Sequence, residues 1–178
     1  MDYTYSGNRR TQFTRMCIAE AIIELMQKED LNHIKISAVT KKAGVSRKTF
    51  YNYFSSLHEV LTDYLQEIIA EYLEACNGKT ELGSFLEYPH ILFALKFFDQ
   101  YARYFLTLTG QGLHSILLNG INQFMIAEFS KNMRHTVYEM YCYSGGLLNT
   151  FLKWEESNKE QSPEEIAHII YKLYNSKI

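Results

Sequence analysis

Apolar residues recur at spacings of three and four along almost the whole chain, and this periodicity restricts the fold more than any other feature. In an α-helix such a spacing puts the apolar side chains on one stripe, which must pack against another element. Residues that break helices are scarce, because the 178 residues include two prolines and nine glycines. The pattern predicts an all-α fold, and a hydrophobic content of 47% is enough to build a core.

The first 55 residues have the layout of a helix-turn-helix. An apolar stripe predicts a long helix over about residues 11–29, and Ser37 is a candidate N-cap for a short second helix. Gly44 is suited to the tight turn that ends this helix, because glycine readily adopts positive φ. Ser46 can then cap a third helix that continues to about Tyr53.

Further helices are expected in the rest of the chain. Ser55 or Ser56 can cap a helix to about Cys76, and residues 77–84 have the composition of a connector. Pro89 can occupy the first turn of a helix that extends to Ala102. Breaks near residues 109–112 and before 135 separate helices over about 113–131 and 135–156, and Ser162 with Pro163 starts a last one. We therefore expect about nine helices, divided into domains over 1–55 and 56–178.

Basic chemistry is concentrated in the N-terminal part. Residues 1–60 contain nine Lys and Arg against six Asp and Glu, whereas the remainder contains nine against fourteen. Arg47, Lys48 and Thr49 fall in the first turn of the third expected helix, at the positive end of its dipole, where they can donate to phosphates and base edges. Phe50 and Phe54 are four residues apart and should anchor the opposite face.

Residues 36–61, ISAVTKKAGVSRKTFYNYFSSLHEVL, resemble the signature of the TetR family of one-component transcriptional regulators, A-x-x-A-G-V-S-x-x-T-x-Y-x-x-F. The resemblance implies a helix-turn-helix whose third helix enters the major groove, while Ser37 and either Thr40 or Lys41 meet the DNA backbone. The family usually has a lysine near the start of the fourth helix, where this chain has Leu57 and His58. Either affinity is lower and His58 is merely exposed, or His58 takes part and binding weakens as it loses its proton. The residues expected to contact DNA are Ser37, Thr40, Lys41, Ser46, Arg47, Lys48, Thr49, Tyr51, Asn52 and His58.

The second expected domain is rich in aromatic residues, with fifteen of the 26 in the chain lying between residues 85 and 154. They are either core packing or the lining of an effector pocket, for which the candidates are Phe93, Phe97, Tyr101, Tyr104, Phe105, Phe124 and Tyr141. The segments ELMQKEDLNHIKI, TLTGQG and GGLLNTFLKWEESNKEQSPEEIAHII also resemble a subgroup that includes regulators of dihydroxyacetone metabolism. This looser resemblance leaves a small molecule or a partner protein as the effector.

A homodimer is implied by the same resemblance, because in the family the last two helices pack against their symmetry mates. The corresponding interface residues are Leu148, Phe151, Leu152, Ile166, Ile169, Ile170 and Leu173. Gly145 and Gly146 lie inside an expected helix, where each glycine costs up to about 1 kcal/mol relative to alanine. We expect the close approach of another helix to explain them, with a ligand against the backbone as the alternative.

Several protein classes are disfavoured by the sequence. There is no apolar run of signal-peptide or membrane-spanning length, which indicates a cytoplasmic protein. Cys17, Cys76 and Cys142 are far apart and are expected to be buried thiols, and no metal site, cofactor motif or nucleophile–base pair is evident. The expected function is therefore not enzymatic. It is a homodimeric repressor on a palindromic DNA operator, released by a small-molecule effector or, alternatively, switched by a partner protein.

Overall fold

The computed structural model of the protein describes residues 9–129 and 136–175. These residues form α-helices and two short 3-10 helices and contain no strand, which confirms the all-α prediction. The nine α-helices of the described residues are α1 (Arg9–Met26), α2 (Ile36–Ala43), α3 (Arg47–Tyr53), α4 (Leu57–Cys76), α5 (Tyr88–Asp99), α6 (Ala102–Gly110), α7 (His114–Phe129), α8 (Val137–Glu156) and α9 (Pro163–Asn175). The 3-10 helices are Leu31–His33 and Thr80–Leu82.

The chain divides into two compact units. The first unit contains residues 1–70 together with 107–117, so a turn that is distant in sequence belongs with the N-terminal helices. The second unit contains residues 71–106 and 118–178. In the described residues, no helix is both long enough and apolar enough to cross a membrane.

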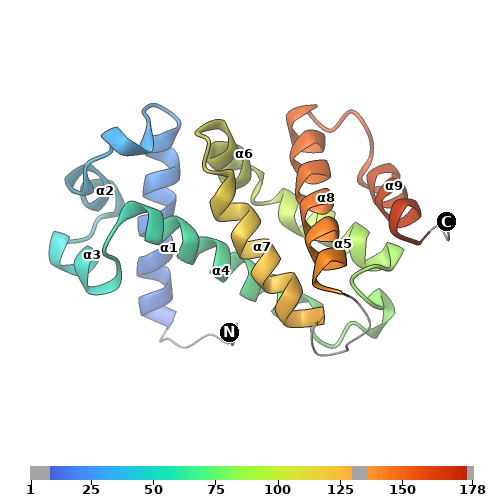
Figure 1. The fold of residues 1–178 in the computed structure, drawn as a ribbon. Coiled ribbons are helices and arrows are strands. Elements are labelled where there is room, and N and C mark those ends of the chain that lie inside the picture. Colours follow the sequence, from blue (N-terminus) through green and yellow to red (C-terminus); the bar gives the residue numbers. More distant parts are fainter. Residues whose placement is uncertain (1–8, 130–135, 176–178) are drawn as a thin grey trace. The chain divides into compact units, whose positions relative to one another are not determined.

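The first unit is built on α1, which packs against α2, while α2 also packs against α3 (Figure 1). Helices as short as α2 and α3 are not stable alone in water, so their conformation depends on this burial. Ile22 of α1, Val39 of α2 and Phe50 of α3 each have 0% exposed surface. Arg15 of α1 forms an ion pair with Asp63 of α4, which adds a polar link between these helices.

The start of α2 differs from the prediction, because Ser37 is not its N-cap. The N-cap is Lys35, whose carbonyl accepts hydrogen bonds from the Ala38 and Val39 N–H groups at 2.8 and 3.2 Å. Ser37 therefore lies inside the first turn and caps nothing. Val39 is completely buried. Packing of this apolar face favours an N-cap at Lys35, two residues before the N-cap that the sequence predicts.

The second unit also differs from the prediction in one helix. The apolar pattern around Pro89 predicts a single helix that reaches Ala102, but α5 ends at Asp99 and α6 begins at Ala102. The Tyr101 N–H donates to the Phe98 carbonyl at 2.9 Å, which is the tighter bond of a turn rather than that of an α-helix. The Asp99 carboxylate pairs with Lys159, so it is committed to a contact outside the helix.

The prediction that all three cysteines are buried is wrong. Cys17 and Cys76 are partly exposed, Cys142 is exposed, and all three are free thiols. Cys76 is the last residue of α4 and Cys142 lies on an outward face of α8, so their positions in the helices outweigh the usual preference of the residue for burial. Among the described residues, no cluster of three or more His, Cys, Asp and Glu side chains is placed to hold a metal ion.

Candidate functional site

The turn between α2 and α3 is three residues long and is fixed by backbone and capping hydrogen bonds. Gly44 ends α2 in the left-handed region at a φ of 68°, and the Val45 N–H donates to the Thr40 carbonyl at 3.0 Å. Ser46 begins α3, and its hydroxyl oxygen accepts from the Thr49 N–H at 2.9 Å. Both helix ends agree with the prediction, and together they fix the direction in which α3 leaves the turn.

Helix α3 has one buried face and one polar face. Phe50 is completely buried and Phe54 is 4% exposed, with 5.9 Å between their ring centroids. Four other side chains of the helix are exposed: Arg47 and Lys48 in the first turn, and Tyr51 and Asn52 farther along. Tyr51 is 52% exposed although its ring forms an edge contact with that of Phe50, with 5.5 Å between the centroids. The aromatic residues thus anchor a helix that presents donors to solvent.

The remaining residues expected to contact DNA lie on α2 and at the start of α4. Ser37 and Lys41 are exposed, whereas Thr40 is 4% exposed and donates from its hydroxyl to the Ser37 carbonyl at 3.3 Å. Of the two alternatives on α2, Lys41 therefore presents its side chain to solvent. His58 is the second residue of α4 and is exposed. Sequence analysis overlooked Lys35, an exposed cation at the N-cap of α2, because the helix was expected to start at Ser37.

The charges around the turn are partly neutralised within the unit. Lys42 forms an ion pair with Glu24 of α1, and the Ser55 hydroxyl and backbone N–H donate to Glu59 and lower the pKa of that carboxyl. Glu59 is therefore an anion that is already engaged at the start of α4. Three exposed cations on α2 and α3, namely Lys41, Arg47 and Lys48, have no ion-pair partner among the described residues. They give this surface its positive charge.

In the second unit an aromatic cluster surrounds Tyr72, a residue of α4 that sequence analysis did not single out. Tyr72 is 1% exposed, and burial raises its pKa well above the usual value. Its ring centroid lies 4.9 Å from that of Phe98 and 5.3 Å from that of Phe97. Tyr72 was overlooked because α4 was interpreted only as the helix that follows the turn. The sequence did indicate its burial, because Tyr72 follows the apolar residues Ile68 and Ile69 at helical spacing.

The expected effector residues fall into three groups of exposure. Tyr104, Phe105 and Phe124 are buried, Phe93, Phe97 and Tyr101 are partly exposed, and Tyr141 is exposed. Phe93 and Phe124 lie within 6.3 Å of the Tyr72 ring, measured between centroids, and Tyr101 donates its hydroxyl to Glu71. Most of these residues are thus brought together by packing, whereas Tyr141 points outward.

One thiol and one imidazole lie close together beside this cluster. The His90 Nδ1–H donates to the Gly83 carbonyl at 3.2 Å, and its Nε2 lies 3.9 Å from the Cys76 Sγ. Burial lowers the pKa of His90 and raises the pKa of Cys76. Both shifts favour the neutral thiol and the neutral imidazole over a thiolate and an imidazolium.

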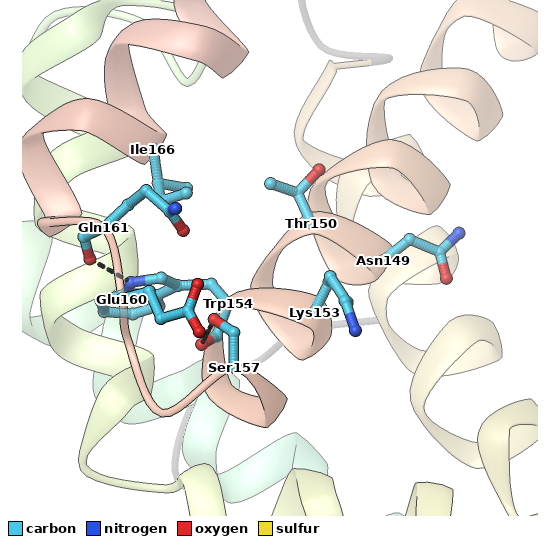
Figure 2. Close-up of a pocket in the computed structure, with 8 residues that line it drawn as sticks. All are labelled: Asn149, Thr150, Lys153, Trp154, Ser157, Glu160, Gln161 and Ile166. Atoms are coloured by element: carbon cyan, nitrogen blue, oxygen red, sulfur yellow. Dashed lines mark hydrogen bonds between the residues drawn. The ribbon is translucent and has the colours of Figure 1, made fainter.

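An open pocket of about 430 Å³ lies where α8 connects to α9. Its lining includes Trp154, whose indole N–H donates to the Gln161 carbonyl at 2.8 Å, as Figure 2 shows. The lining residues are Asn149, Thr150, Lys153, Trp154, Ser157, Glu160, Gln161 and Ile166. None of the expected effector residues is among them, and Ile166 comes from the expected dimer interface.

The residues expected at the dimer interface divide into two sets. Leu148, Phe151, Leu152, Ile166 and Ile170 are buried within the chain, with 6% or less of their surface exposed. Ile169 is 49% exposed and Leu173 is 73% exposed, and both lie on the outward face of α9. The apolar stripes of α8 and α9 thus serve mainly as the core of one chain, which periodicity alone cannot distinguish from an interface.

The two glycines of α8 have different surroundings. A Cβ atom on Gly146 would lie 2.3 Å from the Tyr174 Oη of α9, which confirms the predicted close approach of another helix. A Cβ atom on Gly145 would have no described neighbour within 4 Å. The Tyr174 hydroxyl donates to the Cys142 carbonyl at 3.0 Å, so Gly146 makes room for a hydrogen bond between α9 and α8.

The sequence of the chain is similar to those of known proteins. Residues 18–62 match the model of the family described as bacterial regulatory proteins, tetR family. Over 168 residues the chain is 22% identical to YxbF of Bacillus subtilis (strain 168), an uncharacterized HTH-type transcriptional regulator, with 90% of this chain and 44% of that protein covered. Over 71 residues it is 32% identical to DhaS of Lactococcus lactis subsp. lactis (strain IL1403), the HTH-type dhaKLM operon transcriptional activator, with 40% and 38% covered. The chain thus spans less than half the length of each of these relatives.

The same fold is found in the crystal structure of Lin0861 from Listeria innocua. The structural match covers 96% of this chain and 94% of the Lin0861 chain. The TM-score is 0.77 at 15% sequence identity, so this likeness concerns the fold. A capped third helix after a glycine turn is the layout of a helix-turn-helix. The family model over residues 18–62 and the HTH-type relatives support a TetR-type transcriptional regulator, with the family match lying on the helix-turn-helix.

Proposed function

We propose that the protein binds a palindromic DNA operator as a homodimer and represses transcription until an effector releases it. The observation that carries the proposal is the polar surface of α3, where Arg47, Lys48, Tyr51 and Asn52 are exposed while Phe50 is buried. A helix anchored in this way can enter the major groove with its N-terminal residues toward the bases. Two such helices in a dimer would read half-sites about one helical turn apart.

Arg47→Ala and Lys48→Ala test this assignment. Both side chains are exposed, so the variants should unfold at the wild-type temperature. Each lost phosphate contact should reduce the slope of log affinity against log salt concentration by about 0.9. Fluorescence anisotropy on the DNA upstream of the protein's own gene, against scrambled DNA and at several salt concentrations, measures both effects.

Lys172→Ala is the matched control, because Lys172 is an exposed cation on α9 in the other unit. It should leave both affinity and slope unchanged. Wild-type affinity in the Arg47 and Lys48 variants would remove α3 from the proposed interface. A wild-type protein that binds both DNAs equally and weakly would contradict the operator itself.

Dimerisation is proposed to use the outward faces of α8 and α9. Ile169 and Leu173 on α9 and Tyr138 and Tyr141 on α8 are large apolar or aromatic side chains with 49% to 79% of their surface exposed. Exposed side chains of this kind on neighbouring helices are typical of an isologous contact. Leu173→Glu should shift sedimentation from dimer to monomer, whereas Lys172→Glu, one residue away, should do so less. A monomeric wild-type protein would contradict the proposal.

The effector is proposed to act on the second unit, where the aromatic cluster around Tyr72 gathers most of the candidate residues. A small molecule that releases DNA must bind one state of the dimer better than the other. The alternative is a partner protein, which is favoured by the burial of Tyr104, Phe105 and Phe124 within the chain. Thermal stabilisation by a metabolite panel would support the small molecule. No stabilisation, together with DNA binding that changes only in cell extract, would support the partner.

A further inference from the structure

Gln111, in the turn between α6 and α7, forms hydrogen bonds with three backbone groups in the segment that leads from α1 to α2. The Gln111 Nε2 donates to the carbonyls of Met26 and Glu29 at 2.7 and 3.0 Å. Its Oε1 accepts from the Leu31 N–H at 2.8 Å. All of these residues belong to the first compact unit, although Gln111 is 80 or more positions away in sequence.

The bonded groups are those through which the chain leaves α1. The Met26 carbonyl is at the last residue of α1 and has no acceptor role inside the helix. Glu29 and Leu31 flank Asp30, which caps the 3-10 helix Leu31–His33 by accepting from the Asn32 N–H at 2.8 Å. Three residues after His33, at Ile36, α2 begins. The position of this segment therefore helps to set where α2, and after it α3, starts.

Gln111 itself is held in place by the turn that follows α6. The Leu113 N–H donates to the Leu108 carbonyl at 2.8 Å and the Gly112 N–H to the Thr109 carbonyl at 3.0 Å, with Gly112 at a φ of 72°. This is the Schellman arrangement, in which a glycine in the left-handed region ends the helix. Leu108 is completely buried, so the turn is anchored in the core.

A primary amide is the side-chain group that satisfies all three partners. It offers two N–H donors and one carbonyl acceptor, which match two carbonyls and one N–H. A carboxylate of the same size would set negative oxygen against the Met26 and Glu29 carbonyls. We infer that Gln111 is a positioning residue for DNA binding: it fixes the segment from α1 to α2 and thereby the orientation of α3. This inference rests on the proposed function, because it assigns Gln111 a role in that interaction.

The experiment compares Gln111→Glu and Gln111→Ala with Gln123→Glu and Gln123→Ala. Gln123 is exposed on α7 in the second unit, so its variants repeat the same chemical changes elsewhere. Operator affinity by anisotropy should fall about tenfold or more in both Gln111 variants, because alanine loses all three hydrogen bonds and glutamate loses the two that the amide N–H groups donate. The salt slope should stay at the wild-type value, since the phosphate contacts are retained. Amide exchange should increase at Leu31 and through the start of α2.

The outcomes separate a failure of this inference from a failure of the proposed function. Wild-type affinity in both Gln111 variants would overturn the positioning role, whether or not exchange at Leu31 increases. Loss of affinity with unchanged exchange at Leu31 would also overturn it, because the effect would then arise elsewhere. If wild-type protein binds no DNA selectively, the proposed function fails and the role assigned here fails with it. If Gln111→Glu does not fold, Gln111→Ala, which introduces no charge, carries the test.

Discussion

The two adjacent glycines of α8 offer a test in which identical substitutions should have opposite consequences. Alanine in place of glycine inside a helix stabilises by about 1 kcal/mol when nothing else changes. At Gly145 no described atom outside its own stretch of helix lies within 4 Å of the new Cβ, so Gly145→Ala should gain this amount. At Gly146 the new Cβ would lie 2.3 Å from the Tyr174 Oη, and the tyrosine must move.

Moving Tyr174 removes two interactions. One is the hydrogen bond from its hydroxyl to the Cys142 carbonyl, with a net contribution of about 1 kcal/mol. The other is the edge contact with Tyr143 at 4.8 Å between ring centroids, which contributes about 0.5–1.5 kcal/mol. After the gain in helix propensity, Gly146→Ala should be neutral to about 2 kcal/mol less stable than wild type. The free energy of unfolding in urea should therefore differ by about 1–3 kcal/mol between the two alanine variants.

Tyr174→Phe completes a double-mutant cycle. In the wild-type background it removes the hydrogen bond and should cost about 1 kcal/mol. In the Gly146→Ala background it also removes the clashing oxygen, which leaves the ring carbon Cζ at 3.5 Å from the new Cβ, an ordinary contact. The cost should then vanish or become a gain. Equal stability of the two alanine variants, or a Tyr174→Phe effect that is the same in both backgrounds, would refute the reasoning.

Two further predictions concern pH. Burial raises the pKa of the Glu155 carboxyl above 4.5, so its contribution to stability is complete below pH 4.5 and is lost as pH rises through the folded pKa. From about pH 4 to pH 8, the free energy of unfolding of Glu155→Gln should therefore exceed that of wild type by an amount that grows with pH. The exposed Glu156→Gln should show no such growth. Burial lowers the pKa of His90 below 6.5, so its contribution is complete above 6.5 and is lost as pH falls through the folded pKa. The stability of wild type relative to His90→Gln should decline below that pH, and a constant difference would contradict the assignment, as would an equal decline relative to the exposed His114→Gln.

The features predicted correctly from sequence depend on partners within a few residues. Ser46 caps Thr49 three positions later, Gly44 closes the turn next to it, and Ser162 accepts from the Glu165 N–H at 3.2 Å. Each signal is a local hydrogen bond or a local backbone conformation, so it is visible in the sequence. The buried and exposed positions of α3 could also be predicted from the sequence, because helical periodicity separates them.

The features that were missed depend on tertiary contacts. Ser37 has the chemistry of an N-cap, but the packing of Val39 moves the start of α2 to Lys35. The buried residues of α8 and α9 have the same periodicity as an interface. Only tertiary packing distinguishes Leu148, which is buried within the chain, from Leu173, which is exposed. Gln111 had no local signal, because its partner Met26 is 85 positions away. The residues of the candidate DNA-binding surface could thus be proposed from the sequence, whereas the contacts that hold this surface in position could not.

The discontinuous first unit limits how the N-terminal helices can be transplanted. A fragment that ends at residue 70 would lack residues 107–117, and with them Leu108 and Leu117, which are completely buried. Such a fragment would keep the whole helix-turn-helix sequence and still lose part of its own core. Chimaeras that join these helices to another regulator should therefore retain the later turn as well, because the unit is not a portable N-terminal module.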